Sequence, residues 1–151
     1  MSEKNPGLSA EEKAAAKARA AELRAEARSK KAEDKLAAEA AAYDDALAAT
    51  EGPDRELLLA LGEIVAAEAP HLTRKTMYGM PAWARDGKTV FFFQPALKFK
   101  TRYPTLGFDP AAPLDDGEFW PTSFALTGMG PNTRQRIAEL VRQAAEPLPA
   151  S

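Results

Sequence analysis

The chain has 151 residues, with 20 lysines and arginines against 22 aspartates and glutamates, and it contains no cysteine. The net charge of -2 gives no overall attraction to nucleic acid or to an anionic membrane, so a charged partner must be recognised by a local patch. Without cysteine, the chain has no disulfides, iron–sulfur clusters, zinc–thiolate sites or thiol nucleophiles.

The N-terminal residues 1–8 carry no apolar core of a signal peptide, and nowhere does the chain hold about 18 consecutive apolar residues. We therefore expect a cytoplasmic protein without a membrane partner. We also expect residues 1–8 to be disordered.

A long alanine-rich charged helix is predicted over residues 9–49. Ser9 and Glu12 have the spacing of a capping box, and no glycine or proline follows until Gly52. Residues 13–31 are predominantly basic, which is typical either of a solvated helix or of a segment that binds an anionic partner. Sustained heptads of large apolar residues are missing, so we expect a monomer or a weak alanine-lined dimer.

The second half of this helix is expected to dock on the folded domain, because Leu36, Tyr43 and Leu47 share one helix face. Few large apolar residues precede Leu36. We therefore expect residues 9–33 either to project from the domain or to break near residues 28–31.

The folded domain is predicted over residues 50–146, followed by a flexible tail at 147–151. A helix over residues 53–69 carries leucines at helical spacing, and another begins near Gly130 and ends before Pro147. Between them, β-branched and aromatic runs separated by glycine, proline and aspartate predict strands at 73–78, 82–85, 89–94, 97–102, 105–108 and 123–126. This order predicts an α+β fold, an antiparallel sheet with helices on one face.

Three cations alternate with Leu97, Phe99 and Thr101, which would place them together on one face of the predicted strand 97–102. Such a row either binds an anionic partner, such as a protein, a phosphate ligand or nucleic acid backbone, or is an ordinary solvated face. Nucleic acid is the less expected partner because of the net charge. The candidate anion-binding residues are Lys98, Lys100 and Arg102.

Several carboxylates could supply oxygen ligands to a hard cation, although no spacing matches a dedicated metal loop. With no thiol and a single histidine, any metal site would be oxygen-rich and weak. The candidate ligands are Glu56, Glu63, Asp109, Asp115, Asp116 and Glu118.

No nucleophile and base are placed together by a motif, so we expect no enzymatic activity. An unusual aromatic cluster at residues 78–83 either lines a ligand groove or forms a rigid strand connection with its aromatic residues in the core. The groove would be formed by Tyr78, Met80 and Trp83.

The run Tyr78-Gly79-Met80-Pro81-Ala82-Trp83, followed by Asp86-Gly87-Lys88 and the aromatic segment 90–93, resembles the YdhG-like domain family, a domain of unknown function. The resemblance covers about residues 43–146. It implies a frataxin-like two-layer α+β sandwich. Some relatives are described as intracellular iron chaperones. The resemblance therefore also implies a protein that delivers ferrous iron to a protein of cluster or haem assembly.

Two functions are therefore expected. The first is a small non-enzymatic protein similar to the frataxin-like iron chaperones, with weak carboxylate-mediated ferrous iron binding and no firmly bound cofactor. The second is an interaction module that binds an anionic partner through the basic row.

Overall fold

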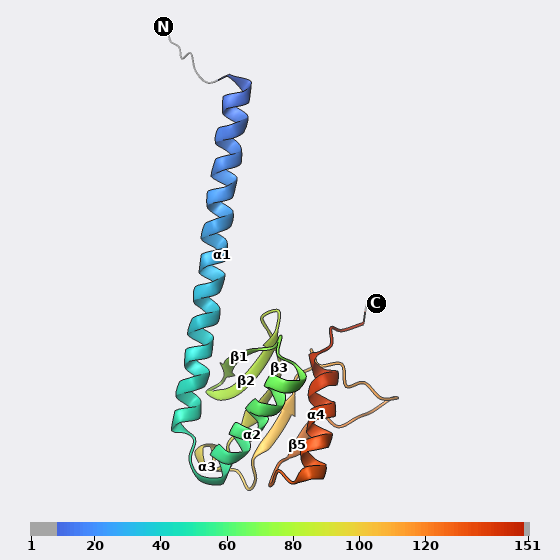
Figure 1. Cartoon of the computed structure of the whole chain (residues 1–151). Coiled ribbons are helices and arrows are strands. Elements are labelled where there is room, and N and C mark those ends of the chain that lie inside the picture. The colour runs from blue at the N-terminus through green and yellow to red at the C-terminus, as the bar shows by residue number, and fades with distance from the viewer. Residues whose placement is uncertain (1–8, 150–151) are drawn as a thin grey trace. The chain divides into compact units, whose positions relative to one another are not determined.

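The computed structural model describes residues 9–149 (Figure 1). Its contacts divide the chain into two units, with the boundary between Ala37 and Ala38, and each unit is described separately below. The predicted disordered segment 1–8 and the end of the predicted tail lie outside the described residues. The elements are α1 (Ala10–Ala49), α2 (Gly52–Glu68), β1 (Thr73–Met77), β2 (Met80–Arg85), β3 (Lys88–Gln94), α3 (Ala96–Phe99), β4 (Thr105–Phe108), β5 (Ser123–Ala125) and α4 (Pro131–Ala145).

The first unit contains the N-terminal part of α1. The predicted capping box is present: the Glu12 amide donates to Ser9 Oγ at 3.1 Å, and the Ser9 amide donates to Glu12 Oε1 at 3.3 Å. The helix runs without interruption through residues 28–31, so the predicted alternative of a break there is wrong. Apart from the partly buried Ala20, residues 10–37 are exposed.

The second unit contains the end of α1 and all remaining elements. Tyr43 is buried, its ring lies 5.4 Å from that of Trp83, and Leu47 packs against the same core. Docking of this part of α1 is therefore confirmed for Tyr43 and Leu47. Leu36 remains exposed.

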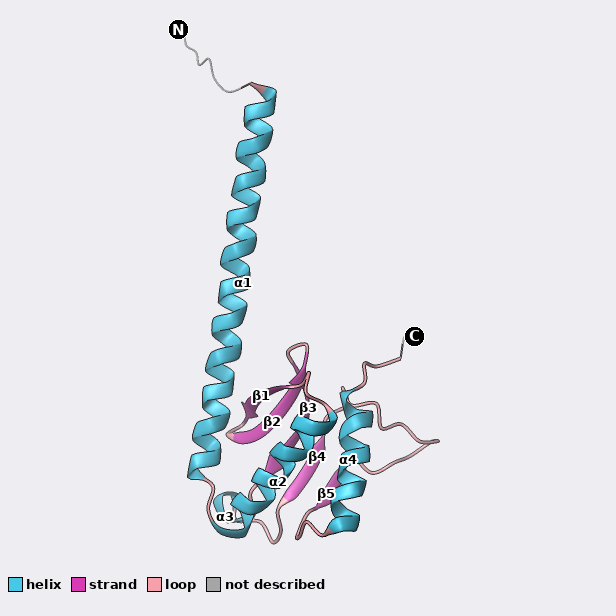
Figure 2. Ribbon diagram, viewed as in Figure 1, coloured by secondary structure: helices cyan, strands magenta, loops and turns pink. Residues whose placement is uncertain are grey.

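The five strands form an antiparallel sheet in the order β1-β2-β3-β4-β5, and α2 and α4 lie on one face of it (Figure 2). The predicted α+β architecture is confirmed. Arg74, Trp83, Phe91 and Phe108 form a cross-strand row on the covered face, since each is paired with the next in register. The rings of Tyr43, Trp83, Phe91, Phe108 and Phe124 follow one another across this face in edge-to-face and tilted contacts, with neighbouring centroids 5.2–5.8 Å apart. The core is therefore a row of aromatic rings packed beneath two helices.

Both hairpin turns at the start of the sheet contain a residue and a glycine with positive φ. The turn at Asp86-Gly87 has φ values of 51° and 83°, and the turn at Tyr78-Gly79 has 51° and 79°. Met77 pairs directly with Met80, so β2 starts earlier than predicted.

The predicted strand 97–102 is wrong, because this segment forms the short helix α3 and the loop after it. The buried carboxylate of Asp54, in the first turn of α2, accepts a hydrogen bond from the Leu97 amide at 3.0 Å. After α3, Lys100 adopts the left-handed conformation, and the Thr101 amide returns to the carbonyl of Ala96 at 3.0 Å. Contacts from α2 therefore replace the strand that the local alternation favours.

Candidate functional site

The three candidate cations lie on α3 and on the loop that follows it, not on a strand face. Lys98, Lys100 and Arg102 are all exposed. Among the described residues, none of them forms an ion pair with a carboxylate. The prediction of a shared strand face is wrong, but the structure still presents three cations within one short exposed segment.

The β1–β2 turn lies beside this segment. The Lys98 amine donates to the carbonyl of Gly79 at 3.4 Å. Tyr78, which precedes Gly79, is 88% exposed, and Leu97 is 69% exposed. Together these residues form what we call the basic turn surface, which consists of Tyr78, Leu97, Lys98, Lys100 and Arg102.

Two residues of the basic turn surface hold a backbone conformation that is unfavourable for them. Tyr78 has φ 51° and Lys100 has φ 55°. For a residue with a Cβ, this left-handed region costs about 1–2 kcal/mol. Both side chains are exposed, so core packing does not offset the cost. Glycine or asparagine would be the more stable choice at each position.

The groove that the sequence predicts at Tyr78, Met80 and Trp83 is not formed. Trp83 is only 1% exposed and belongs to the aromatic core, whereas Tyr78 projects at the tip of a turn. Met80 is buried and does not belong to the core cluster that contains Trp83. The alternative of a rigid strand connection fits Met80 and Trp83.

The candidate metal ligands are not brought together. Glu63 pairs with Arg134 at 3.5 Å, and Asp109 Oδ1 accepts from the Ala111 amide at 3.0 Å within its own turn. Glu56, on α2, is exposed, as are the loop residues Asp115, Asp116 and Glu118. In residues 9–149, no group of three or more histidine, aspartate or glutamate side chains is placed to hold a metal. Binding of iron by separate surface carboxylates stays a prediction.

Asp54 is a site residue that the sequence analysis did not single out. It is only 7% exposed, and it lines a recess of about 650 Å³ between the start of α2 and α3, together with Leu97, Lys100 and Thr101. No local pattern indicates the role of Asp54, because the amide that it accepts from lies on a distant segment of the chain. Asp54 holds the start of α3, and with it the backbone that carries Lys98.

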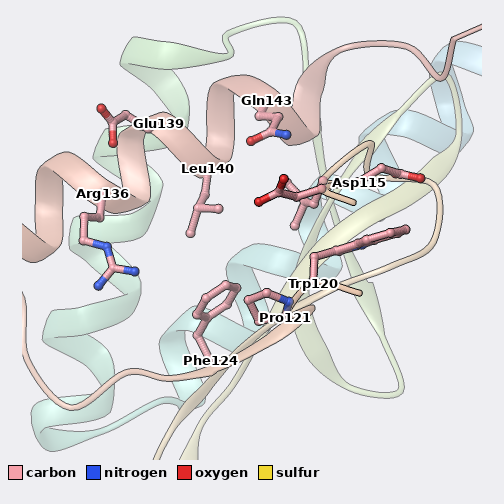
Figure 3. Close-up of a pocket in the computed structure, with 10 residues that line it drawn as sticks. Asp115, Trp120, Pro121, Phe124, Arg136, Glu139, Leu140 and Gln143 are labelled. Carbon is pink, nitrogen blue, oxygen red and sulfur yellow. The ribbon is translucent and has the colours of Figure 1, made fainter. Parts of the chain in front are cut away.

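A second cavity lies beside α4. It has a volume of about 480 Å³, is partly open to solvent, and is lined by α4, β5 and the loop between β4 and β5 (Figure 3). Aromatic and aliphatic side chains line it together with carboxylates and one arginine. Asp115 and Asp116, which the sequence offers as candidate metal ligands, line this cavity, and no local sequence pattern indicates the cavity itself.

Comparisons of the chain with family models, with curated proteins and with solved structures returned no match. The resemblance to the YdhG-like domain family therefore stays a prediction, as does the iron chaperone function that it implies. Over residues 9–149, no helix combines the length and the apolar character needed to cross a bilayer.

Proposed function

We propose that this domain is a non-enzymatic interaction module that binds an acidic segment of a partner protein through the basic turn surface. The observation that carries the proposal is the conformation of Tyr78 and Lys100. The β1–β2 turn and the end of α3 require positive φ at these two positions, and an exposed aromatic and an exposed cationic side chain stand there in place of glycine or asparagine, which would cost less. Residues kept at a cost in stability are candidates for a role outside the domain.

The chemistry of the surface defines the class of partner. Lys98, Lys100 and Arg102 offer charged donors to carboxylates, while Tyr78 and Leu97 offer an aromatic ring and an aliphatic side chain. The mixed surface favours a peptide that alternates acidic and apolar side chains. The net charge of -2 argues against a nucleic acid, which would be attracted by a broad basic field.

The recess beside α3 adds a place for an apolar side chain of the partner. Ala96, Leu97, Lys100 and Thr101 line it, together with Glu51 and the buried Asp54. Because Asp54 holds the Leu97 amide, α3 is preorganised in the free domain, which lowers the entropy lost on binding.

The proposal is tested by titrating the full chain with a synthetic peptide of alternating glutamate and leucine, and with a matched peptide of alternating lysine and leucine. We expect saturable binding of the acidic peptide alone, weakened by salt because charged pairs carry part of it. Lys98→Glu combined with Lys100→Glu should abolish binding. The control, Lys35→Glu with Lys88→Glu, makes the same charge change at two other exposed positions and should retain it.

Tyr78→Asn and Lys100→Gly separate function from folding. Each relieves backbone strain and should raise the free energy of unfolding by about 0.5–1 kcal/mol. Each also removes a side chain from the basic turn surface and should weaken binding of the acidic peptide. Variants that are more stable and bind equally well would contradict the proposal, as would a domain that binds neither peptide.

A further inference from the structure

The cavity on α4 has the size of a small-molecule site and a lining that mixes polar and apolar side chains. Its volume of about 480 Å³ lies within the range of ligand pockets, roughly 300–1,000 Å³. Figure 3 shows Leu140 on α4 opposite Phe124 on β5, with Pro121 and Trp120 on the neighbouring loop. These side chains provide an apolar interior with an aromatic wall.

The loop that closes the cavity is held in place by hydrogen bonds from two other elements. Gln143, on α4, donates to the carbonyl of Pro113 at 3.1 Å, and Arg85, at the end of β2, donates to the carbonyl of Ala111 at 3.0 Å. Leu114 is buried, which fixes the residue immediately before Asp115. The cavity is therefore part of the folded domain and does not require a ligand to form.

The charges around the cavity favour a cation. Three carboxylates, from Asp115, Asp116 and Glu139, and a single arginine, Arg136, are among the residues that line it. In Figure 3 the Arg136 and Glu139 side chains extend from α4 in different directions, and within residues 9–149 no ion pair joins them. Trp120 presents an indole, the aromatic ring that attracts cations most strongly. A ligand with an ammonium group beside an apolar body would match both features.

We propose that this cavity binds a small aromatic amine, with the ring against Trp120, Phe124 and Leu140 and the ammonium at Asp115 and Asp116. The site uses other residues than the basic turn surface, so it stands independently of the proposed function. Neither aspartate forms an ion pair with another residue in 9–149, which leaves their charge available to a ligand.

The experiment titrates the full chain with 2-phenylethylamine and, separately, with 3-phenylpropanoate, which has a similar body and the opposite charge. Tryptophan fluorescence reports binding, because Trp120 lines the cavity while Trp83 is buried in the core. The amine should give a saturable change and the carboxylate none. Asp115→Asn combined with Asp116→Asn should lower the affinity for the amine by about fivefold or more.

Asp34→Asn with Asp45→Asn is the matched control, since it removes two exposed carboxylates outside the cavity and should leave amine affinity unchanged. A urea unfolding curve of each variant checks that the fold is retained. Equal binding of the amine and the carboxylate would overturn the proposal. Amine binding that survives the loss of Asp115 and Asp116 would also overturn it, as would no saturable change at millimolar amine.

Discussion

The ring of Phe92 occupies the space that a side chain at residue 107 would need: a Cβ added to Gly107 would lie 2.3 Å from Phe92 Cζ. The two residues are paired in register between β3 and β4, on the face of the sheet opposite the aromatic core. Ala82 flanks Phe92 on the other neighbouring strand. Phe92 is thus packed between small residues on the face of the sheet opposite α2 and α4.

Gly107→Ala is therefore expected to destabilise the domain by about 1–3 kcal/mol, because the added methyl group forces the Phe92 ring from its place. In a Phe92→Ala background, the same change should be neutral or stabilising, since alanine costs less entropy than glycine in a strand. Urea unfolding of the four proteins measures the coupling. Additive effects of the two substitutions would contradict the packing described here.

Asp54→Ala should lower the free energy of unfolding by about 1–2 kcal/mol, because the Leu97 amide loses its acceptor. The change should also speed hydrogen exchange of the Leu97 amide. Asp54→Asn keeps an oxygen acceptor and is the matched control, with a smaller expected loss. If both variants exchange Leu97 at the wild-type rate, the carboxylate does not hold α3.

Arg85 joins the end of β2 to three carbonyl groups. Its guanidinium donates to Ala144 at 3.1 Å, to Glu146 at 2.7 Å and to Ala111 at 3.0 Å. Arg85→Lys cannot reproduce this fork and should cost about 1–3 kcal/mol in thermal or urea unfolding. Arg102→Lys, at an exposed position, should change stability by less than about 0.5 kcal/mol. Equal effects at the two positions would contradict the role of Arg85.

Stability should fall in alkali because of Tyr43. Burial raises the pKa of Tyr43 to about 12, from 10.0; Arg74 lowers it in part, and Asp44 adds to the rise. Below pH 10 the hydroxyl is neutral in both states. Between pH 10 and 12 it ionises only in the unfolded chain, so the free energy of unfolding should fall by up to about 2–3 kcal/mol.

Tyr43→Phe is the control for this pH dependence. The variant should show a shallower loss of stability above pH 10, while its stability at neutral pH should stay within about 1 kcal/mol of the wild type. The comparison is made by urea unfolding at a series of pH values. Parallel curves for the two proteins would show that Tyr43 ionises equally in both states.

Iron binding is the prediction that follows from the resemblance to the YdhG-like domain family. An anaerobic calorimetric titration with ferrous iron should give saturable heat that an equal titration with magnesium does not. Substituting Asp115 and Asp116 by asparagine and Glu118 by glutamine should reduce the heat of iron binding. The controls are Asp34→Asn and Asp45→Asn, which should leave that heat unchanged. Heats that match those of magnesium would leave only unspecific attraction to carboxylates.

The sequence predicts elements well where the local pattern and the tertiary contacts agree. The capping box at Ser9, the helix over 53–69 and the strand at 89–94 each depend on neighbouring residues, and all are confirmed. The segment at 97–102 alternates like a strand, yet a carboxylate from α2 caps it as a helix. Such a contact has no local signature.

The candidate sites follow the same rule. The sequence places Lys98, Lys100 and Arg102 close together by proximity alone, and the structure keeps them exposed while changing their geometry. The cavity on α4 was not predicted, because Trp120, Phe124 and Leu140 converge from a loop, a strand and a helix. Convergence of this kind depends on topology that residue patterns do not encode.

The two edge strands of the sheet, β1 and β5, determine whether copies of the domain can pair edge to edge at high concentration. β5 offers only Ser123–Ala125 and follows Pro121, so it is a poor template for another strand. β1 carries Arg74 and Lys75, which pair with Asp44 at 2.7 Å and Glu39 at 3.6 Å on α1. Charged side chains and a short edge are devices that resist edge-to-edge aggregation. We therefore expect concentrated solutions of the domain not to aggregate by strand pairing between molecules.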